Sequence, residues 1–156
     1  MRFDEAVFER IAMSRFGYQM AVHVAPHIDK RLIPWTGGRF GTMGFGKIGL
    51  VTSIGAKSGQ ERTNPLTLIR DGVGLLAIGS NYGRDKHPAW SANLKANPEC
   101  TVEYNGPPRR YRAELLSGPE REAAWKTAVD FYAGYEAYRE QAAPREIRVF
   151  RLRPVE

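Results

Sequence analysis

The sequence has few of the features that stabilise secreted domains or carry a chain across a membrane. Its 156 residues include one cysteine, Cys100, so no disulfide can form within the chain. No apolar run approaches the roughly 20 residues of a membrane-spanning helix, and the N-terminus lacks the basic-then-apolar order of a secretion signal. No repeat or low-complexity tract is apparent. These absences predict a globular, cytoplasmic protein.

The histidines and the nucleophilic side chains are equally sparse. Of the three histidines, His23 and His27 are separated by Pro26, and His87 stands alone, so we expect no metal site. Neither Ser58 nor Ser80 has a recognisable base beside it, and Cys100 is surrounded by strand-forming residues, which argues against covalent catalysis. The sequence therefore offers no metal-dependent or nucleophilic mechanism.

Chain length and net charge limit the possible fold classes and binding partners. A chain of this length can bury the core of one domain, and a composition that is 42% hydrophobic and 26% charged is that of a globular protein. The net charge of +6 favours an acidic partner, which could be a phosphorylated cofactor, an anionic membrane or nucleic acid. No nucleic-acid-binding module accompanies the charge, so we expect no nucleic-acid partner.

The first 45 residues differ from the rest of the chain. Residues 3–22 place apolar side chains at helical spacing, which predicts an amphipathic helix. Its polar face mixes acids and bases, so packing against the domain is favoured over peripheral contact with a membrane. Residues 26–45 are rich in glycine and predict an irregular lid segment. We expect one domain, residues 1–156, in which residues 46–156 form a barrel that binds a cofactor.

From residue 48 the period becomes that of strands. The sequence predicts strands at 48–54, 65–70, 73–80, 100–104, 109–116 and 147–152. Asp71 and Gly72 give the strongest hairpin signal. Helices are predicted for about 88–97 and from Ser117 onward, with a break at Gly134. The order of elements is that of a mainly β (α+β) protein, a small β-barrel decorated with helices.

The stretch from Gly55 to Arg70 joins two of these strands through a glycine-rich, cationic loop. Lys57 and Arg62 can place positive charge over a phosphate, and the glycines allow a tight turn whose N–H groups converge on an anion. The composition of the loop by itself fits an ordinary polar hairpin at least as well. The loop is therefore a candidate anion site that needs support from elsewhere.

That support comes from the second half of the chain. Gly79 and Ser80 end a strand, and the helix that follows carries an aromatic ring and amides on one face. Tyr132, Tyr135 and Tyr138 recur at intervals of three. Buried phenols need hydrogen-bond partners, so a cavity or groove suits them better than a solid core. These patterns predict a pocket for a planar ring beside the phosphate loop.

With these residues in view, the chain resembles the deazaflavin-dependent nitroreductase family, which includes F420H2-dependent quinone reductases of actinobacteria. The resemblance covers about residues 36–138. It rests on Thr36-Gly37-Gly38-Arg39, on Gly-x-Lys-Ser-Gly-Gln-x-Arg-x-Asn-Pro-Leu at 55–66, on Gly79-Ser80, on Lys86-His87-Pro88-x-Trp90-x-x-Asn93-Leu94, on Asn97-Pro98 and on the three tyrosines. It implies a split β-barrel of the FMN-binding/pyridoxamine oxidase-like type.

The resemblance also implies a role for each motif. The phosphate of coenzyme F420 would be held by Lys57, Ser58 and Arg62, with Ala56 in the same cofactor-binding loop. The pocket wall would continue through Thr63, Asn64, Pro65, Leu66 and Thr67. The deazaflavin would lie beside Ile78, Gly79, Ser80 and Asn81, against Ala89, Trp90, Ser91, Ala92 and Asn93, with Tyr135 facing the ring and the substrate. The catalytic candidates are Ser80, Tyr132, Tyr135 and Tyr138.

The implied reaction is hydride transfer from the reduced deazaflavin to a quinone, a nitroaromatic or an activated alkene. Two other functions stay open from the residues alone. A flavin mononucleotide oxidoreductase could use the same phosphate loop and ring pocket. A module without activity could bind the deazaflavin or an anionic membrane through its basic surface.

Overall fold

The computed structural model describes residues 40–41, 44–45 and 48–155. The helix predicted for residues 3–22, and most of the predicted irregular segment up to residue 45, lie outside the described residues. Two short strands are described within that segment, β1 (Phe40–Gly41) and β2 (Gly44–Phe45), which pair with each other in antiparallel fashion.

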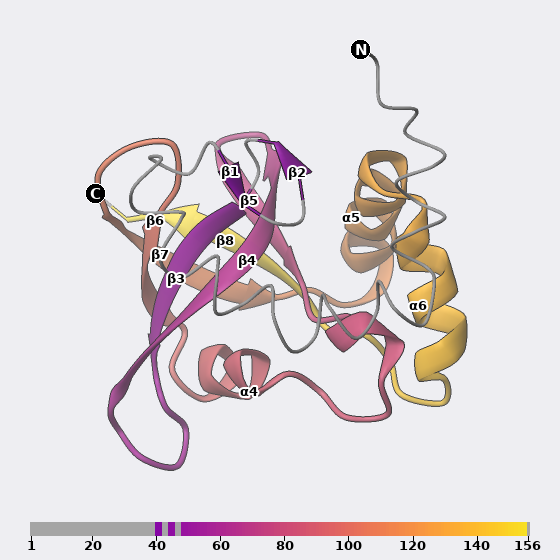
Figure 1. The fold of residues 1–156 in the computed structure, drawn as a ribbon, viewed down its shortest axis with the longest axis horizontal. Helices are drawn as coiled ribbons and strands as arrows, with labels where there is room; N and C mark the ends of the chain where they lie inside the picture. Colours follow the sequence, from indigo (N-terminus) through magenta and orange to yellow (C-terminus); the bar gives the residue numbers. More distant parts are fainter. Residues whose placement is uncertain (1–39, 42–43, 46–47, 156) are drawn as a thin grey trace.

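The body of the fold is a closed barrel of antiparallel strands (Figure 1). Its strands are β3 (Ile48–Ile54), β4 (Glu61–Asp71), β5 (Gly74–Ile78), β6 (Glu99–Glu103), β7 (Arg109–Leu115) and β8 (Val149–Pro154). Their order around the barrel is β3-β4-β5-β8-β7-β6, and β3 also pairs with β6, which closes the ring. The predicted fold class, a mainly β barrel with peripheral helices, is confirmed.

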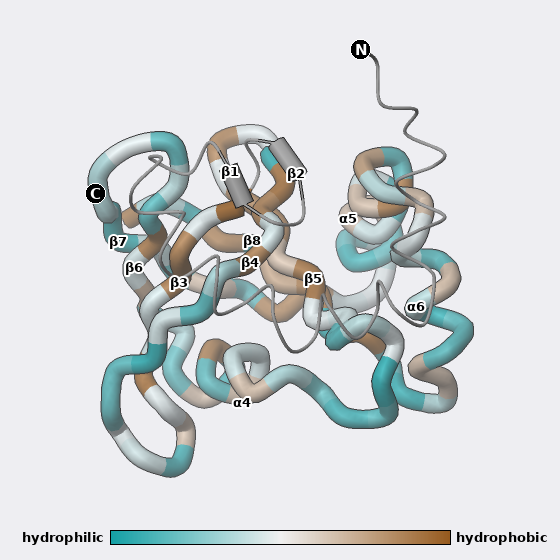
Figure 2. Tube along the Cα trace, in the orientation of Figure 1, coloured by the Kyte–Doolittle hydropathy of each residue, from teal (hydrophilic) through white to brown (hydrophobic). Residues whose placement is uncertain are grey.

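Strand-forming residues fill the inside of this barrel. Every residue of β5 is buried, whereas β7 alternates between the exposed Arg112 and the buried Ala113, as a strand with one wet face requires. The interior cluster includes Leu68, Leu75 and Phe150. Burying one side chain of this size contributes about 1.5–3 kcal/mol. In Figure 2 the strands β5 and β8 carry this hydrophobic character, while the loop between β3 and β4 is mostly hydrophilic.

Helices surround the barrel on two sides (Figure 1). The short 3-10 helix η1 (Asn81–Gly83) and α4 (Ala89–Ala96) lie between β5 and β6 in the chain, and α5 (Gly118–Phe131) and α6 (Gly134–Ala142) lie between β7 and β8. A second buried cluster joins α5 and α6 to the barrel wall, with Leu76, Trp125 and Ile147 among its members. None of the described helices is long and apolar enough to span a bilayer.

Two strands begin two or more residues away from their predicted starts, whereas the helix break lies where it was predicted. Strand β4 begins four residues before the predicted 65, because the polar residue Thr63 still pairs with Thr52, with their hydroxyl oxygens 2.8 Å apart. Strand β8 covers Val149–Pro154 and is shifted by two residues from 147–152. The helix after Ser117 ends at Phe131 and a new one begins at Gly134, as the predicted break required.

Candidate functional site

The hairpin loop, residues 55–60, is closed by its own backbone. The Gly55 N–H donates to the Gln60 carbonyl at 2.7 Å, and the Gly59 N–H donates to the Gly55 carbonyl at 2.9 Å. One side-chain contact holds the loop against α4, because the Ala56 N–H donates to Oδ1 of the buried Asn93 at 2.9 Å. This contact brings the predicted phosphate loop and the predicted helix face together.

The two cations of this region, Lys57 and Arg62, are exposed and have no acidic partner in the described part of the chain. Arg62 Nη1 reaches only neutral acceptors, Oε1 of Gln60 at 3.3 Å and the Glu61 carbonyl at 3.4 Å. Within residues 48–155, no carboxylate lies within ion-pair distance of Lys57 or Arg62. The loop is therefore a well-formed hairpin and also a site of uncompensated positive charge, which suits an anionic ligand.

Arg148, from the segment before β8, binds the first turn of α4 through Ser91. The hydroxyl of Ser91, which is fully buried, donates to the Pro88 carbonyl at 2.9 Å and accepts from Arg148 Nη1 at 3.2 Å. The ring of Trp90 packs against that of Phe150 in the barrel, with ring centroids 5.9 Å apart. The exposed members of this turn are Ala89 and Ala92. Of the predicted helix residues, Ser91 therefore supports the turn with its hydroxyl.

The 79–87 turn, residues 79–87, connects β5 to α4. Its backbone is strained, because Asn81 and Tyr82 have φ values of 47° and 56° without being glycine. The Asn81 amide donates to the Lys86 carbonyl at 2.8 Å and so closes the turn. The Gly79 N–H donates to the Arg148 carbonyl at 2.8 Å, which fixes the start of the turn to the residue before β8.

Arg145, in the segment between α6 and β8, contacts the 79–87 turn from behind. Its guanidinium donates to the carbonyls of Gly79 (3.2 Å), Ser80 (2.7 Å) and Arg84 (2.8 and 3.0 Å). Its Nη1 also lies 3.3 Å from Nδ1 of His87. Burial lowers the pKa of His87, and the nearby Arg148, Arg145 and Lys95 lower it further.

The three tyrosines meet although the helix does not continue through them. Tyr132 lies at the break, and its ring centroid is 5.4 Å from that of Tyr135 and 6.2 Å from that of Tyr138. Tyr135 and Tyr138 are only 7% and 9% exposed. The sequence favoured a cavity or groove for these phenols, and the structure instead packs them ring against ring. Tyr82 of η1 joins them, 6.1 Å from Tyr138.

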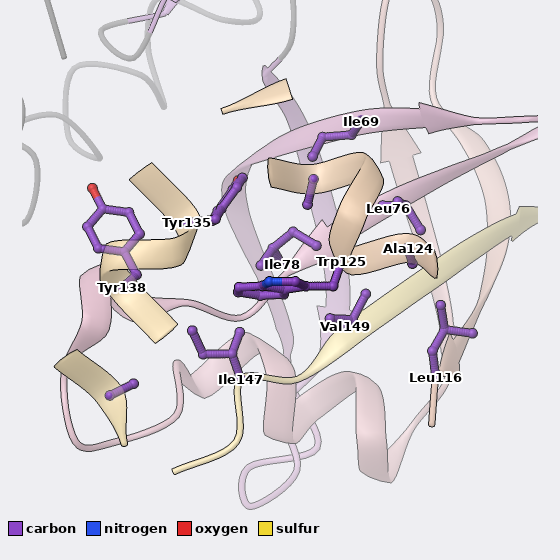
Figure 3. Close-up of a cluster of buried hydrophobic side chains, with 12 residues drawn as sticks. Ile69, Leu76, Ile78, Leu116, Ala124, Trp125, Tyr135, Tyr138, Ile147 and Val149 are labelled. Carbon is purple, nitrogen blue, oxygen red and sulfur yellow. The ribbon is translucent and has the colours of Figure 1, made fainter. Parts of the chain in front are cut away.

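The hydroxyl groups of this tyrosine cluster are in an unusual environment. Burial raises the pKa of Tyr135, and burial together with Tyr132 raises that of Tyr138. The buried hydroxyl of Tyr132 has no hydrogen-bond partner within the described part of the chain. Figure 3 shows Trp125 in the middle of the apolar cluster and the hydroxyl of Tyr138 directed away from it. Tyr135 and Tyr138, whose pKa values are raised, therefore stay neutral at neutral pH and keep an O–H that can donate a hydrogen bond.

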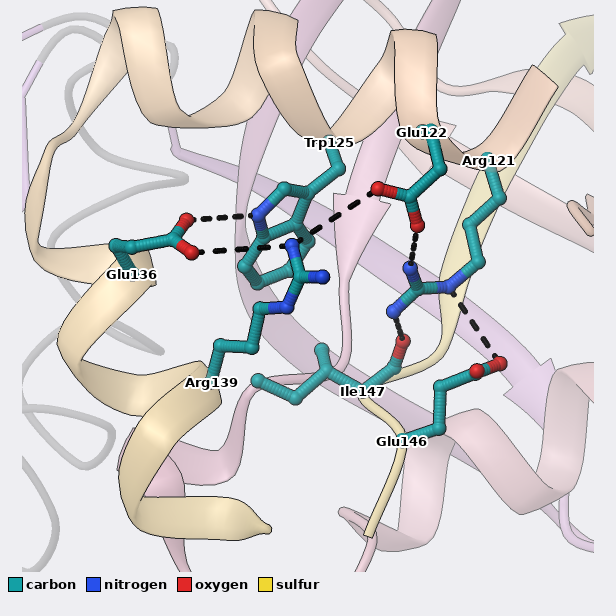
Figure 4. Close-up of polar contacts among 7 residues, drawn as sticks. All are labelled: Arg121, Glu122, Trp125, Glu136, Arg139, Glu146 and Ile147. Atoms are coloured by element: carbon teal, nitrogen blue, oxygen red, sulfur yellow. Dashed lines mark hydrogen bonds and ion pairs between the residues drawn. The ribbon is translucent and has the colours of Figure 1, made fainter. Parts of the chain in front are cut away.

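Hydrogen bonds and ion pairs between side chains hold α6, which carries Tyr135 and Tyr138, against α5 (Figure 4). Trp125 Nε1 donates to Glu136 Oε2 at 3.0 Å, and the Trp125 ring lies 5.4 Å from the guanidinium of Arg139. The buried Arg121 donates to the Ile147 carbonyl at 2.8 Å. Because these contacts join α5, α6 and the segment before β8, they set where the tyrosine cluster stands relative to the barrel.

The predicted residues thus form one continuous region rather than scattered points. The hairpin loop contacts α4 through Asn93, the 79–87 turn leads into α4, and Tyr82 of that turn contacts the tyrosine cluster. The β4 residues are less uniform. Leu66 packs with Trp90 against the barrel cluster, whereas Thr63 is exposed. Ile78 faces the α5 and α6 side.

Arg145 and Arg148 are important residues that the sequence did not identify. Both stand in the segment between α6 and β8, Arg145 outside any predicted element and Arg148 within the strand predicted at 147–152. Their contacts are with residues 57 to 66 positions earlier in the chain. A lone arginine in such a segment carries no local signal, and only the closure of the barrel places it beside the site.

Comparison with known families identifies the protein class. The model of the F420H(2)-dependent quinone reductase family matches residues 28–154. The chain belongs to this family. Accordingly the protein is a coenzyme F420-dependent reductase, and its cofactor is reduced coenzyme F420.

Individual relatives agree with this assignment. A Mycobacterium tuberculosis protein named for F420H(2)-dependent quinone reduction is 33% identical over 98 residues, which are 63% of this chain and 82% of that protein. A second from that organism is 45% identical over 62 residues, 40% of each chain. The solved structure of an F420-H2 dependent reductase is 37% identical with a TM-score of 0.61, covering 68% of this chain and 93% of the other.

The chemistry of the described residues fits this cofactor. The exposed Lys57 and Arg62 leave positive charge for its anionic part. The 79–87 turn begins with Gly79, whose missing side chain lets the backbone approach closely, since a Cβ there would lie 3.2 Å from the Arg148 carbonyl. The candidate site therefore has exposed cations, Lys57 and Arg62, at one end and the tightly packed backbone at Gly79 at the other.

Proposed function

We propose that the protein transfers a hydride from reduced coenzyme F420 to a quinone. The observation that carries this proposal is the continuity of the region. At one end are the exposed Lys57 and Arg62, which have no ion-pair partner among the described residues, and at the other is the buried, neutral hydroxyl of Tyr135. Such an arrangement suits an anionic cofactor that must present its ring to an oxygen-bearing acceptor. The family name supports the quinone as acceptor.

On the cofactor side, Lys57, Ser58 and Arg62 would bind the phosphate. The Ala56 N–H is already used by Asn93, so Ala56 would contribute through position rather than through its donor. Gly79, Ser80 and Asn81 would lie beside the ring. The remaining wall would be formed by the other predicted residues, Thr63, Asn64, Pro65, Leu66, Thr67, Ile78, Ala89, Trp90, Ser91, Ala92 and Asn93.

On the acceptor side, Ser80 and the tyrosine cluster would bind the oxygen that gains charge. When bound, the reduced coenzyme supplies the hydride. The raised pKa of Tyr135 keeps its hydroxyl neutral, so the hydroxyl can donate a hydrogen bond but is a poor acid. We therefore assign Tyr135 to stabilising the developing charge, with Tyr132 and Tyr138 as its neighbours.

Nitroaromatics and activated alkenes are further candidate acceptors. Each carries an electron-poor group with an oxygen that can accept a hydrogen bond, as a quinone does, so the same phenols would serve. Contact with a membrane through residues 3–22 stays a prediction from the sequence, because those residues lie outside the described part of the chain.

The experiment is oxidation of reduced coenzyme F420, followed by its absorbance, with menadione, a nitroimidazole and a cyclic enone as separate acceptors. Turnover with menadione is the expected result, and the other two rank the wider acceptors. Binding of the coenzyme without reduction of any acceptor would favour a carrier without activity. Binding of flavin mononucleotide in place of the deazaflavin would overturn the proposal.

A further inference from the structure

Arg145 is unusual because a charged side chain is used almost entirely on backbone carbonyls. It makes four hydrogen bonds to the carbonyls of Gly79, Ser80 and Arg84 and one contact to His87. No carboxylate of residues 48–155 lies within ion-pair distance of it. An arginine that formed an ordinary surface ion pair would be arranged differently.

The 79–87 turn needs such support because its own backbone is unfavourable. Asn81 and Tyr82 follow one another with positive φ, a conformation that costs about 1–2 kcal/mol for each residue other than glycine. The carbonyls of Gly79, Ser80 and Arg84 converge on one side. A planar guanidinium with five N–H donors in a fixed fork can bind several of them at once, which an ammonium group cannot do with the same geometry.

The contact between Arg145 and His87 requires a particular protonation state of the imidazole. Arginine has only donors, so the nitrogen of His87 that faces it, Nδ1, must be the acceptor. The imidazole must then be neutral, with its proton on Nε2. Burial, Arg148, Arg145 and Lys95 all lower the pKa of His87, and Asp85 is the acid that acts on Arg145. A protonated His87 would direct an N–H at the guanidinium and oppose the contact.

We propose that Arg145 is a positioning residue that holds Gly79 and Ser80 in place for the coenzyme, and that it does so only while His87 is neutral. The proposal rests on the proposed function in one respect, since it takes residues 79–81 as the segment beside the ring. The contacts themselves stand independently of any ligand.

The first test uses the protein without coenzyme. Hydrogen exchange is measured at the Gly83 and Arg84 amides, which donate within the turn to the Ser80 and Asn81 carbonyls. In Arg145→Ala both amides should exchange on the order of tenfold to a hundredfold faster, because hydrogen bonds to a charged group are lost. Arg145→Lys, which keeps the charge but not the fork, should fall between the wild type and the alanine variant. The Gly55 amide should be unchanged in both.

The matched control is Arg151→Ala. Arg151 is a half-buried arginine that binds Asp71 at 2.6 Å and Glu120 at 2.8 Å, away from the turn. This variant should leave exchange at Gly83 and Arg84 as in the wild type. If the control accelerates exchange as much as Arg145→Ala does, or if Arg145→Ala and Arg145→Lys leave it unchanged, the positioning role is refuted.

The second test concerns His87. Coenzyme affinity of the wild type should fall as the pH drops through the pKa of His87 in the folded protein, which lies below the ordinary histidine value of about 6.5. In His87→Asn the side-chain carbonyl can replace Nδ1 as acceptor and does not titrate, so the fall should disappear. A fall that persists unchanged in His87→Asn would overturn the pH condition.

These tests separate the inference from the proposed function. A wild-type protein that neither binds nor oxidises reduced coenzyme F420 refutes the proposed function, whereas hydrogen exchange still decides the role of Arg145. A wild type with full activity, joined to an Arg145→Ala variant with unchanged exchange and unchanged coenzyme affinity, refutes the inference alone. A protein with both roles shows faster exchange and at least tenfold weaker binding in Arg145→Ala.

Discussion

The hairpin loop and the 79–87 turn differ in how they use positive charge. Both turn through a glycine of positive φ, Gly59 at 67° and Gly83 at 75°. The hairpin loop keeps Lys57 exposed to solvent, and a Cβ at Gly59 would have nothing within 4 Å. The backbone carbonyls of the turn accept hydrogen bonds from Arg145, and a Cβ at Gly83 would lie 3.1 Å from the Tyr138 carbonyl. The charge of Lys57 is therefore free to meet a ligand in the proposed site, whereas the charge of Arg145 fixes the backbone of the 79–87 turn.

Substitution of the two glycines should show the largest difference. Gly83→Ala should lower the free energy of unfolding by about 2–4 kcal/mol, because strain from positive φ adds to overpacking against Tyr138 and Gln141. Chemical denaturation measures the change. Gly59→Ala, its control, should cost only the strain of about 1 kcal/mol. Equal losses would mean that the crowding of the turn has no energetic weight.

Tyr135→Phe should separate turnover from binding. Its ring stays in the cluster, so coenzyme affinity should be unchanged, while kcat should fall by about tenfold, or 1.4 kcal/mol, because a donor to the acceptor oxygen is lost. Steady-state kinetics with menadione and a binding titration give the two values. Because the pKa of Tyr135 is raised above its ordinary value of about 10, the wild-type rate should show no ionisation of Tyr135 below that pH. Weaker coenzyme binding with unchanged kcat would place Tyr135 elsewhere.

Asn93→Ala tests the tie between the hairpin loop and α4. Loss of the Ala56 N–H to Asn93 Oδ1 hydrogen bond should lower the free energy of unfolding by about 1 kcal/mol. Asn97→Ala, at the residue that follows this helix, is the control, because among the described residues its side chain makes one long hydrogen bond, 3.4 Å to the Ile54 carbonyl. Thermal unfolding of the two variants compares them. An equal loss in both would show that the loop is held mainly by its own backbone.

Lys57→Ala should have the smallest effect, and on binding alone. As an exposed side chain without an ion-pair partner in the described structure, Lys57 should change the free energy of unfolding by less than about 0.5 kcal/mol. Coenzyme affinity should fall by about two- to fivefold, and less at high salt, because exposed charges are screened. Titration at two ionic strengths measures this. Unchanged affinity at low salt would leave the loop as an ordinary hairpin.

Much of the barrel could be predicted because its signals are local. The apolar run of β5 and the Asp71-Gly72 turn identify a hairpin directly, and Gly134 marks the break between α5 and α6. The start of β4 could not be read in the same way. Its first residues are polar and pair with β3 at the rim, where period-two burial does not apply.

The residues of the candidate site likewise fall into those that local motifs predict and those that only tertiary packing brings together. The hairpin loop, Gly79-Ser80 and the start of α4 are contiguous motifs, so the resemblance could name them. The burial of Tyr135 could not be predicted, because it depends on how α6 packs against α5 and the barrel through Trp125 and Glu136. Arg145 could not be predicted either, since its partner Gly79 stands 66 residues earlier.

The position of β8 between β5 and β7 has a consequence for synthesis on the ribosome. A growing chain presents β5 and β7 long before β8 emerges, and until then each has an open edge where β8 will pair. Arg145 leaves the ribosome just ahead of that strand. The cofactor site therefore cannot mature before β8 has been synthesised, and reduced coenzyme F420 added to stalled nascent chains should bind only after residue 154 has cleared the exit tunnel.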